Sequence, residues 1–303
     1  MSWLDEHREE ALALLRAAVL APSSHNTQPW LFRFGEDCVY LEADRRRALP
    51  VNDPRDRELT ISCGCALLNL RLAAQHLRFD GSMRLSPSAR EPDLLARVSL
   101  RVAEGSPVDE SALFAAIPRR HTYRRRFATE PVAASCLAKL ARAARAEGAR
   151  FVPLLEESSR HEAARLVAEG DACQWADERW RRELAAWMHP RRKGDGVGAK
   201  DHELAEHSPV LAVLTTAEDT PSAWLEAGMA LQRVLLCACQ LGIQASFLNQ
   251  PVQLTLLRSR LAALAGGGWP QVLMRLGHPE GEPPPSPRRS VEDVVDWDDG
   301  RTF

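Results

Sequence analysis

The chain has 303 residues, which is enough for two domains or for one large domain with a well-filled core. Hydrophobic residues make up 45% and charged residues 26%, an ordinary globular composition. The formal net charge of −2 excludes a general attraction to nucleic acid or anionic lipid, so such a partner would need a local basic patch.

The remaining composition argues against export, membrane insertion and metal binding. The amino terminus, MSWLDEHREE, lacks the basic-then-apolar layout of a secretory signal. The longest apolar helical stretch, 229–241, is too short and too polar to span a bilayer. Seven scattered cysteines indicate reduced, buried thiols, and none of the nine histidines has zinc-site spacing. We therefore expect a soluble, cytoplasmic protein without a metal.

The first part of the chain alternates helical and extended patterns. An amphipathic helix is predicted first and ends at a Pro-Ser stretch. A hairpin then turns at Gly35-Glu36-Asp37, before a second helix and two further strands. In chain order, the predicted elements are a helix over 2–20, strands over 30–34 and 38–41, a helix over 58–76, and strands over 82–85 and 98–102.

The order of elements then starts again. A helix is predicted over 133–146, strands over 151–155 and 210–215, a largely buried helix over 224–241, and a last strand over 272–276. Three stretches of the first half match the second half at offsets of 126, 164 and 174 residues. The matched residues include Leu14 with Leu140, Gly64 with Gly228, and Arg101 with Arg275. Rising offsets indicate an internal duplication with an insertion in the second copy.

The predicted fold is therefore α+β: a pseudo-dimer, within one chain, of two units with mainly antiparallel sheets and packed helices. The units are assigned to residues 1–110 and 111–303. The insertion, 156–208, holds three tryptophans and the glycine-rich run 193–198. It suits a lid over a site, or a surface excursion packed on its own tryptophans.

Two stretches carry chemistry. The first, APSSHNTQPW at 21–30, places hydroxyl and amide groups beside a tryptophan, as a planar ligand with donor and acceptor edges requires. The second, RRHTYRRRF at 119–127, offers guanidinium forks suited to phosphate. On residue chemistry alone, the first could equally be a polar turn, and the second a solvated basic run or a nucleic-acid patch.

Together the two stretches resemble the signatures of the nitroreductase superfamily. That resemblance implies an FMN site in which the serine-asparagine turn comes from one unit and the arginine segment from the other. The run 53–64, DPRDRELTISCG, is similar to the fused, twin-unit branch of that family called Acg-like. The second unit has no copy of the turn and the first has no arginine segment, so one FMN per chain is expected.

The resemblance also implies which residues bind the cofactor. One extra residue before Phe127 leaves Arg124 and Arg125 competing for one role. Residues 246–249 are expected to lie against the flavin edge, with an ordinary helix-to-strand loop as the alternative, and a solvated tail is the alternative for the last two arginines. The implied ligands are Ser23, Ser24, Asn26, Gln28, Arg120, His121, Thr122, Arg124, Ser246, Phe247, Leu248, Asn249, Arg288 and Arg289.

The implied activity is hydride transfer from NAD(P)H through FMN to a nitroaromatic, quinone or related acceptor. Because the flavin carries the chemistry, no catalytic side chain is named. The alternative is a flavin-sequestering protein whose lid excludes nicotinamide and which turns over little. A nucleic-acid binder is disfavoured by the net charge and by an aromatic content of 6%. Because both units of the pseudo-dimer belong to one chain, a single copy of the protein is enough to form it.

Overall fold

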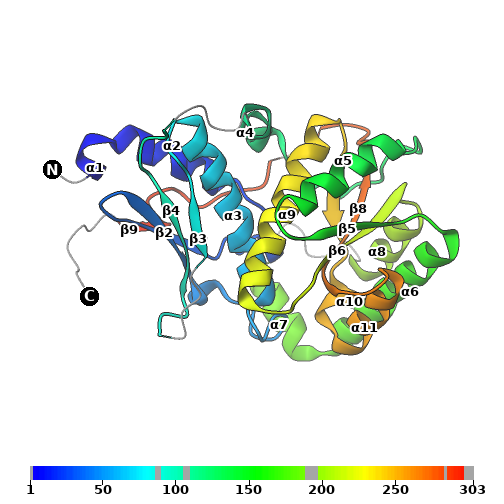
Figure 1. Cartoon of the computed structure of the whole chain (residues 1–303). Helices are drawn as coiled ribbons and strands as arrows, with labels where there is room; N and C mark the ends of the chain where they lie inside the picture. Colours follow the sequence, from blue (N-terminus) through cyan, green and yellow to red (C-terminus); the bar gives the residue numbers. More distant parts are fainter. Residues whose placement is uncertain (1–2, 86–89, 105–109, 188–196, 283–284, 297–303) are drawn as a thin grey trace.

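The computed structural model describes residues 3–85, 90–104, 110–187, 197–282 and 285–296. Two sheets lie at opposite sides, and the long helices α3 (Arg57–His76) and α9 (Pro221–Gln240) pack together between them (Figure 1). Both helices are buried along most of their length, and the main hydrophobic core runs continuously through both halves. The α+β class predicted from sequence is confirmed.

The first sheet is built mostly from the amino-terminal part of the chain. Its order is β3 (Met83–Leu85), β4 (Leu94–Ser99), β2 (Cys38–Ala43), β1 (Trp30–Phe34) and β9 (Val295–Asp296). The β1–β2 hairpin confirms the prediction, and α3 matches the predicted helix to one residue. The last strand, β9, comes from the carboxyl terminus and pairs parallel with β1.

Two predictions in this part were wrong in detail. The helix predicted over 2–20 is divided into α1 (Trp3–Glu6) and α2 (Arg8–Ala18) at His7. The strand predicted over 98–102 is β4, which begins four residues earlier and ends at Ser99. Beyond that point, only an isolated bridge from Val102 to Phe79 continues the pairing.

The second sheet has the order β5 (Arg150–Leu154), β6 (Val210–Thr216), β8 (Trp269–Gly277) and β7 (Gln244–Phe247), all antiparallel. A helix, α5 (Ala134–Arg145), precedes it as α2 precedes the first sheet. In chain order, β1 to β4 and β5 to β8 therefore occupy the same places in their sheets. Shared strand order agrees with the duplication inferred from sequence.

The crossing of α3 and α9 carries the same symmetry. A Cβ on Gly64 would lie 2.3 Å from the Leu225 carbonyl oxygen, and a Cβ on Gly228 would lie 2.1 Å from that of Ile61. These two contacts are exchanged by the 164-residue offset, as expected of an isologous contact between related units. Only glycine permits this approach of the two backbones.

The insertion lies between β5 and β6, where the first unit has only its three-residue hairpin turn. Its helices are α6 (Glu157–Ala176), α7 (Glu178–Trp187) and α8 (Val197–Glu206). Residues 193–196 of the predicted glycine-rich run lie outside the described residues. A smaller core joins α6 to β8 and to two helices absent from the prediction, α10 (Gln250–Gln253) and α11 (Thr255–Leu264). A short helix, α4 (Ser111–Ala116), with the 3-10 turn η3 (Ile117–Arg119), leads from the first unit into the second.

Candidate functional site

The turn between α2 and β1 holds the polar residues predicted from the first motif. It contains a single 3-10 turn, η1 (Ser24–Asn26), and Asn26 and Gln28 have φ of 58° and 52°, in the left-handed region. The Ser23 hydroxyl oxygen accepts a hydrogen bond from the Gln28 N–H at 2.9 Å, and Gln28 Nε2 donates to the Asn26 carbonyl at 3.2 Å. Such backbone strain is frequent at ligand sites.

Ser24 is held by a buried carboxylate. Its hydroxyl donates to Glu58 Oε2 at 2.6 Å. Glu58 also accepts from Arg57 Nη2 at 3.2 Å and from Gln253 Nε2 at 2.9 Å, so it joins α3 to α10 of the other unit. The motif at 53–64 drew attention to Glu58, but no pattern in the sequence indicated Gln253.

The carboxyl-terminal tail returns to the same turn. Asn26 Nδ2 donates to the Pro287 carbonyl at 3.0 Å, and Arg288 Nη1 donates to Asn26 Oδ1 at 3.1 Å. The Arg289 N–H donates to Gln28 Oε1 at 2.7 Å, and its guanidinium donates to the Gln28 carbonyl. The tail is therefore part of the candidate site, and the solvated-tail alternative is wrong.

Arg120 and Arg288 converge on one carbonyl. Arg120 Nη2 lies 3.1 Å and Arg288 Nη2 lies 3.3 Å from the Leu20 oxygen, at the start of the turn. Arg120 is only 3% exposed. Burial, and then the neighbouring Arg288, lower the pKa of Arg120 to about 10. The turn near residue 26 and the arginine segment therefore meet, as the resemblance requires.

The Nε atoms of Arg120 and Arg288 are buried without a hydrogen-bond partner among the described residues. Two adjacent buried guanidinium groups with unused donors are costly unless an anion neutralises them. A phosphate, with several acceptor oxygens, matches this donor set. The residues present therefore fit the phosphate of a nucleotide cofactor.

The rest of the arginine segment lines the same region. Burial, followed by the charges of Arg120 and Arg288, lowers the pKa of His121. Thr122 forms a parallel bridge with Ala245, which places the segment beside β7. The charge of Arg124 lowers the pKa of both Arg120 and Arg288. Of the two competing residues, Arg124 is therefore favoured over Arg125.

The stretch 246–249 is only partly available to a ligand. Ser246 and Phe247 belong to β7, so these two residues do not form the loop that was the alternative. Leu248 is buried in the smaller core, and its N–H donates to the Leu273 carbonyl. Asn249 Oδ1 accepts from the Leu273 N–H at 3.1 Å. The side chains of Leu248 and Asn249 are therefore committed to packing and to β8.

Helix α7 of the insertion lies against η1 and is bonded to the nearby residues Val51 and Asn52. Glu183 accepts hydrogen bonds from the Val51 and Asn52 N–H groups at 2.9 and 2.8 Å, and Trp180 Nε1 donates to Asn52 Oδ1 at 2.9 Å. Beside it lies His25, an exposed residue of η1. His25 stands inside the first motif, but the resemblance assigned it no role.

The second unit has ion pairs at the linker that corresponds to the turn. The linker from α5 to β5 is short, and Glu147 in it accepts hydrogen bonds from Arg71 Nη1 at 3.1 Å and from Arg233 Nε at 2.5 Å. Arg233 is also paired with Glu110. Here guanidinium groups meet carboxylates, whereas within the described parts of the chain no carboxylate is paired with Arg120 or Arg288. Of the two arrangements, the pair of Arg120 and Arg288 is therefore the one suited to an added anion.

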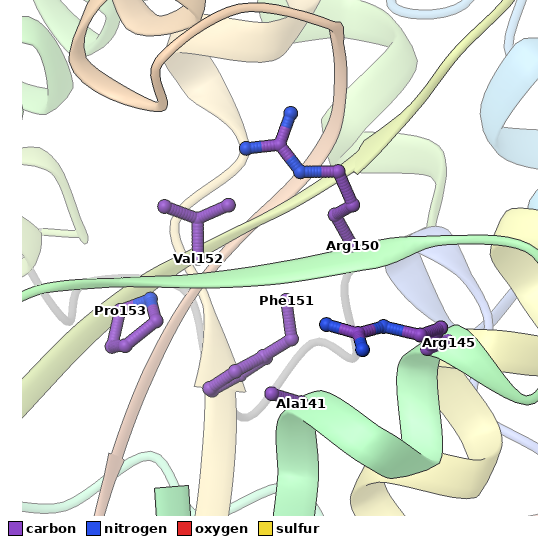
Figure 2. A pocket seen from close by; sticks show the side chains of 6 residues that line it. All are labelled: Ala141, Arg145, Arg150, Phe151, Val152 and Pro153. Carbon is purple, nitrogen blue, oxygen red and sulfur yellow. The ribbon is translucent and has the colours of Figure 1, made fainter. Parts of the chain in front are cut away.

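Two surface hollows lie away from this region. One of about 260 Å³ is lined by β5 and α5 residues such as Arg145, Arg150 and Phe151 (Figure 2). Another of about 280 Å³ includes Arg55 and Trp224. Neither contains a predicted ligand. Among the described residues, we find no cluster of three metal-ligating side chains and no helix with the length and apolar character needed to cross a bilayer.

Comparisons with known proteins give relatives over nearly the whole chain. No family model matches the chain. It is 31% identical over 319 residues to "Putative NAD(P)H nitroreductase Rv3131" of Mycobacterium tuberculosis, covering 95% of this chain and 92% of that protein. It is 27% identical over 309 residues to "Putative NAD(P)H nitroreductase acg" of the same organism, covering 92% and 93%. Among solved structures, oxidized iodotyrosine deiodinase bound to FMN and 3-iodo-L-tyrosine matches with a TM-score of 0.50 and 19% identity. That match covers 63% of this chain and all of the other, and supports the fold alone.

Proposed function

Because the chain belongs to the nitroreductase superfamily, in its Acg-like branch, we propose that it binds one FMN between its two units as an NAD(P)H-dependent oxidoreductase. The observation that carries this proposal is the meeting of Arg120 and Arg288 at the Leu20 carbonyl, with unused buried donors on both. These groups supply what a phosphate needs, next to a turn of hydroxyl and amide groups suited to a flavin ring.

The chain's own residues would divide the work of binding. Arg120, Arg288 and Arg124 would hold the phosphate, with His121 and Thr122 beside them. The turn containing Ser24 would face the ring system. Arg289 is paired with Asp44 and bonded to Gln28, so we assign it to holding the turn in place rather than to direct contact.

When bound, FMN supplies two-electron chemistry, accepting a hydride from NAD(P)H and passing it to an acceptor. The protein holds and orients the cofactor and its partners. Glu58 accepts the hydrogen bond of the Ser24 hydroxyl and so orients it, and the buried Arg120 would fix the phosphate end. We propose nitroaromatics, quinones or related compounds as acceptors.

A second candidate function, flavin sequestration, is favoured by one observation. Helix α7 is attached to the backbone at Val51 and Asn52 through Glu183, close to η1. If it stays attached, nicotinamide would not reach the ring. The protein would then store or protect FMN with little turnover.

One experiment separates these functions. The purified protein is loaded with FMN, its visible spectrum is recorded, and NADPH and NADH are added in turn without oxygen. Yellow protein that bleaches with either donor supports the oxidoreductase. Yellow protein that stays oxidised with both supports sequestration. Colourless protein that cannot be loaded with FMN contradicts both.

A further inference from the structure

Arg275 is a buried arginine of β8 that the assigned site does not use. It is 1% exposed and lies opposite Ser246 in the strand register. Its Nη2 donates two hydrogen bonds to backbone carbonyls, that of Tyr123 at 2.9 Å and that of Arg125 at 3.0 Å. Its guanidinium also lies 4.6 Å from the centre of the Phe127 ring.

The two carbonyls that Arg275 holds flank Arg124. The backbone on either side of it is fixed as well, because the Tyr123 N–H donates to the Ala245 carbonyl at 2.9 Å and the Ala128 N–H donates to the His278 carbonyl at 2.9 Å. Arg124 itself is exposed, and its charge acts on Arg120, Arg288 and His25. Arg275 therefore fixes the stretch of backbone from which this side chain projects.

Burying Arg275 is costly for the fold. Its Nε and Nη1 have no hydrogen-bond partner within the described parts of the chain, and burial lowers its pKa to about 10, so it stays charged near neutral pH. A buried cation in this state is weak support for stability, since an apolar side chain of similar size often serves as well. An arginine at this position therefore needs another explanation than stability. Its two hydrogen bonds to the backbone carbonyls on either side of Arg124 supply one.

We propose that Arg275 is a positioning residue that directs Arg124 toward the phosphate of the bound cofactor. This inference rests on the proposed FMN site. It assigns Arg275 an effect on phosphate recognition in particular, because the carbonyls it holds belong to the arginine segment and not to the turn containing Ser24.

The test compares FMN with riboflavin, which lacks the phosphate. Dissociation constants for both are measured by flavin fluorescence on the wild-type chain, Arg275→Met and Arg275→Lys. We expect Arg275→Met to weaken FMN binding about tenfold, the effect of losing a charge-assisted hydrogen bond, and to change riboflavin binding by less than about threefold. Lysine keeps the charge but cannot reproduce the guanidinium fork, so Arg275→Lys should fall between.

The chain offers a matched control. Arg101 is the repeat counterpart of Arg275, but it is exposed and paired with Asp37. Arg101→Met should leave both affinities unchanged. In addition, Arg275→Lys combined with Arg124→Ala should weaken FMN binding no more than Arg124→Ala alone, because residues acting through one another are not additive.

Equal weakening of FMN and riboflavin in Arg275→Met, or unchanged FMN affinity, would overturn the positioning role. If Arg275→Met does not fold, the FMN affinities of Arg275→Lys and of its combination with Arg124→Ala provide the test. Additive losses of FMN affinity in the double variant would contradict the inference. Failure of the proposed function is a different result, in which the wild-type chain itself binds no FMN or does not prefer it over riboflavin.

Discussion

At the scale of single residues, the site is marked by two neighbouring arginines, Arg120 and Arg288, that have no carboxylate partner among the described residues. Arg71 and Arg233 are by contrast paired with Glu147, whereas the isolated Arg275 is held by backbone carbonyls. Arg120 and Arg288 share a carbonyl oxygen, and the charge of Arg288 adds to burial in lowering the pKa of Arg120. An anion bound between the two guanidinium groups would offset the cost of placing these positive charges together.

Replacing Arg120 tests this arrangement. Arg120→Ala should weaken FMN binding by about 2 kcal/mol, the loss expected for a charged hydrogen bond. The apo-protein should unfold at no lower urea concentration, because a desolvated cation has been removed. Fluorescence titration and urea unfolding measure the two effects. Arg119→Ala is the control, since that neighbour is exposed. Equal effects of the two substitutions on FMN would contradict the phosphate role.

Motifs predicted candidate ligands that lie close to one another in the sequence. They did not predict residues that the fold brings to the site from distant segments. Ser24, Asn26 and Gln28 were found because they share one short turn. Gln253 was not, because a glutamine in a short helix carries no pattern of its own, and His25, although it lies in the same turn, was assigned no role by the resemblance. The expectation that the backbone of 246–249 lies against the flavin stays a prediction, while the Leu248 side chain, just beyond β7, is buried in the smaller core.

At the scale of elements, the crossing of α3 and α9 joins the halves of the site. Glu58 and Arg57 project from α3, and the segment after α9 carries β7. Separation of these helices would therefore disturb FMN binding as well as stability.

Gly64→Ala should show this coupling. The added Cβ would meet the Leu225 carbonyl, which belongs to helical backbone and cannot move aside cheaply. We expect a loss of about 3 kcal/mol in the free energy of unfolding, at the upper end for overpacking. Urea unfolding measures it, with Gly281→Ala as control because nothing lies within 4 Å of a Cβ there. A loss no larger than in the control would refute the close crossing.

The insertion is attached through a polar cluster that should titrate. Gln250 Nε2 donates to Asp171 Oδ1 at 3.0 Å and to Asp201 Oδ2 at 2.9 Å, which joins α10 to α6 and α8. Burial first, and Asp201 second, raise the pKa of Asp171 to about 7, while His202 opposes the shift. Because the folded pKa lies above the ordinary value, the stabilisation is complete at low pH and is lost as pH rises from about 4 to about 7.

Asp171→Asn should remove this pH dependence. The amide keeps an acceptor for Gln250 and carries no charge, so the variant should be more stable than the wild type at about pH 8, with a smaller difference at about pH 4.5. Urea unfolding at the two pH values measures both. The same substitution at the half-exposed Asp177 is the control. A difference independent of pH would contradict the assignment.

Long periodic elements were predictable, whereas short ones depended on tertiary contacts. Helices α3, α5 and α9 each have a continuous apolar face, and their predicted bounds held to within about three residues. By contrast, β7 has four residues, two of them Gln and Ser, and α11 exposes Leu256 at 82%. The two-residue β9 exists only because β1 offers it an edge. The division into units at 110 and 111 stays a prediction.

At the scale of the whole molecule, the proposed site would be formed within one chain by two related units. The sheets repeat the same strand order, yet the two potential sites differ. One has a turn with left-handed residues beside Arg120 and Arg288, and the other has Glu147 bonded to Arg71 and Arg233. Duplication followed by divergence would leave a single flavin site and free the second unit to carry the insertion.

The most direct test of this account is a titration of the apo-protein with FMN at protein concentrations well above the dissociation constant. Binding is monitored by the quenching of flavin fluorescence. We predict a sharp end point at one FMN per chain, lost when Arg120 and Arg288 are both replaced by alanine. An end point at two FMN per chain, or the absence of saturable binding, would contradict a single site built jointly by the two units.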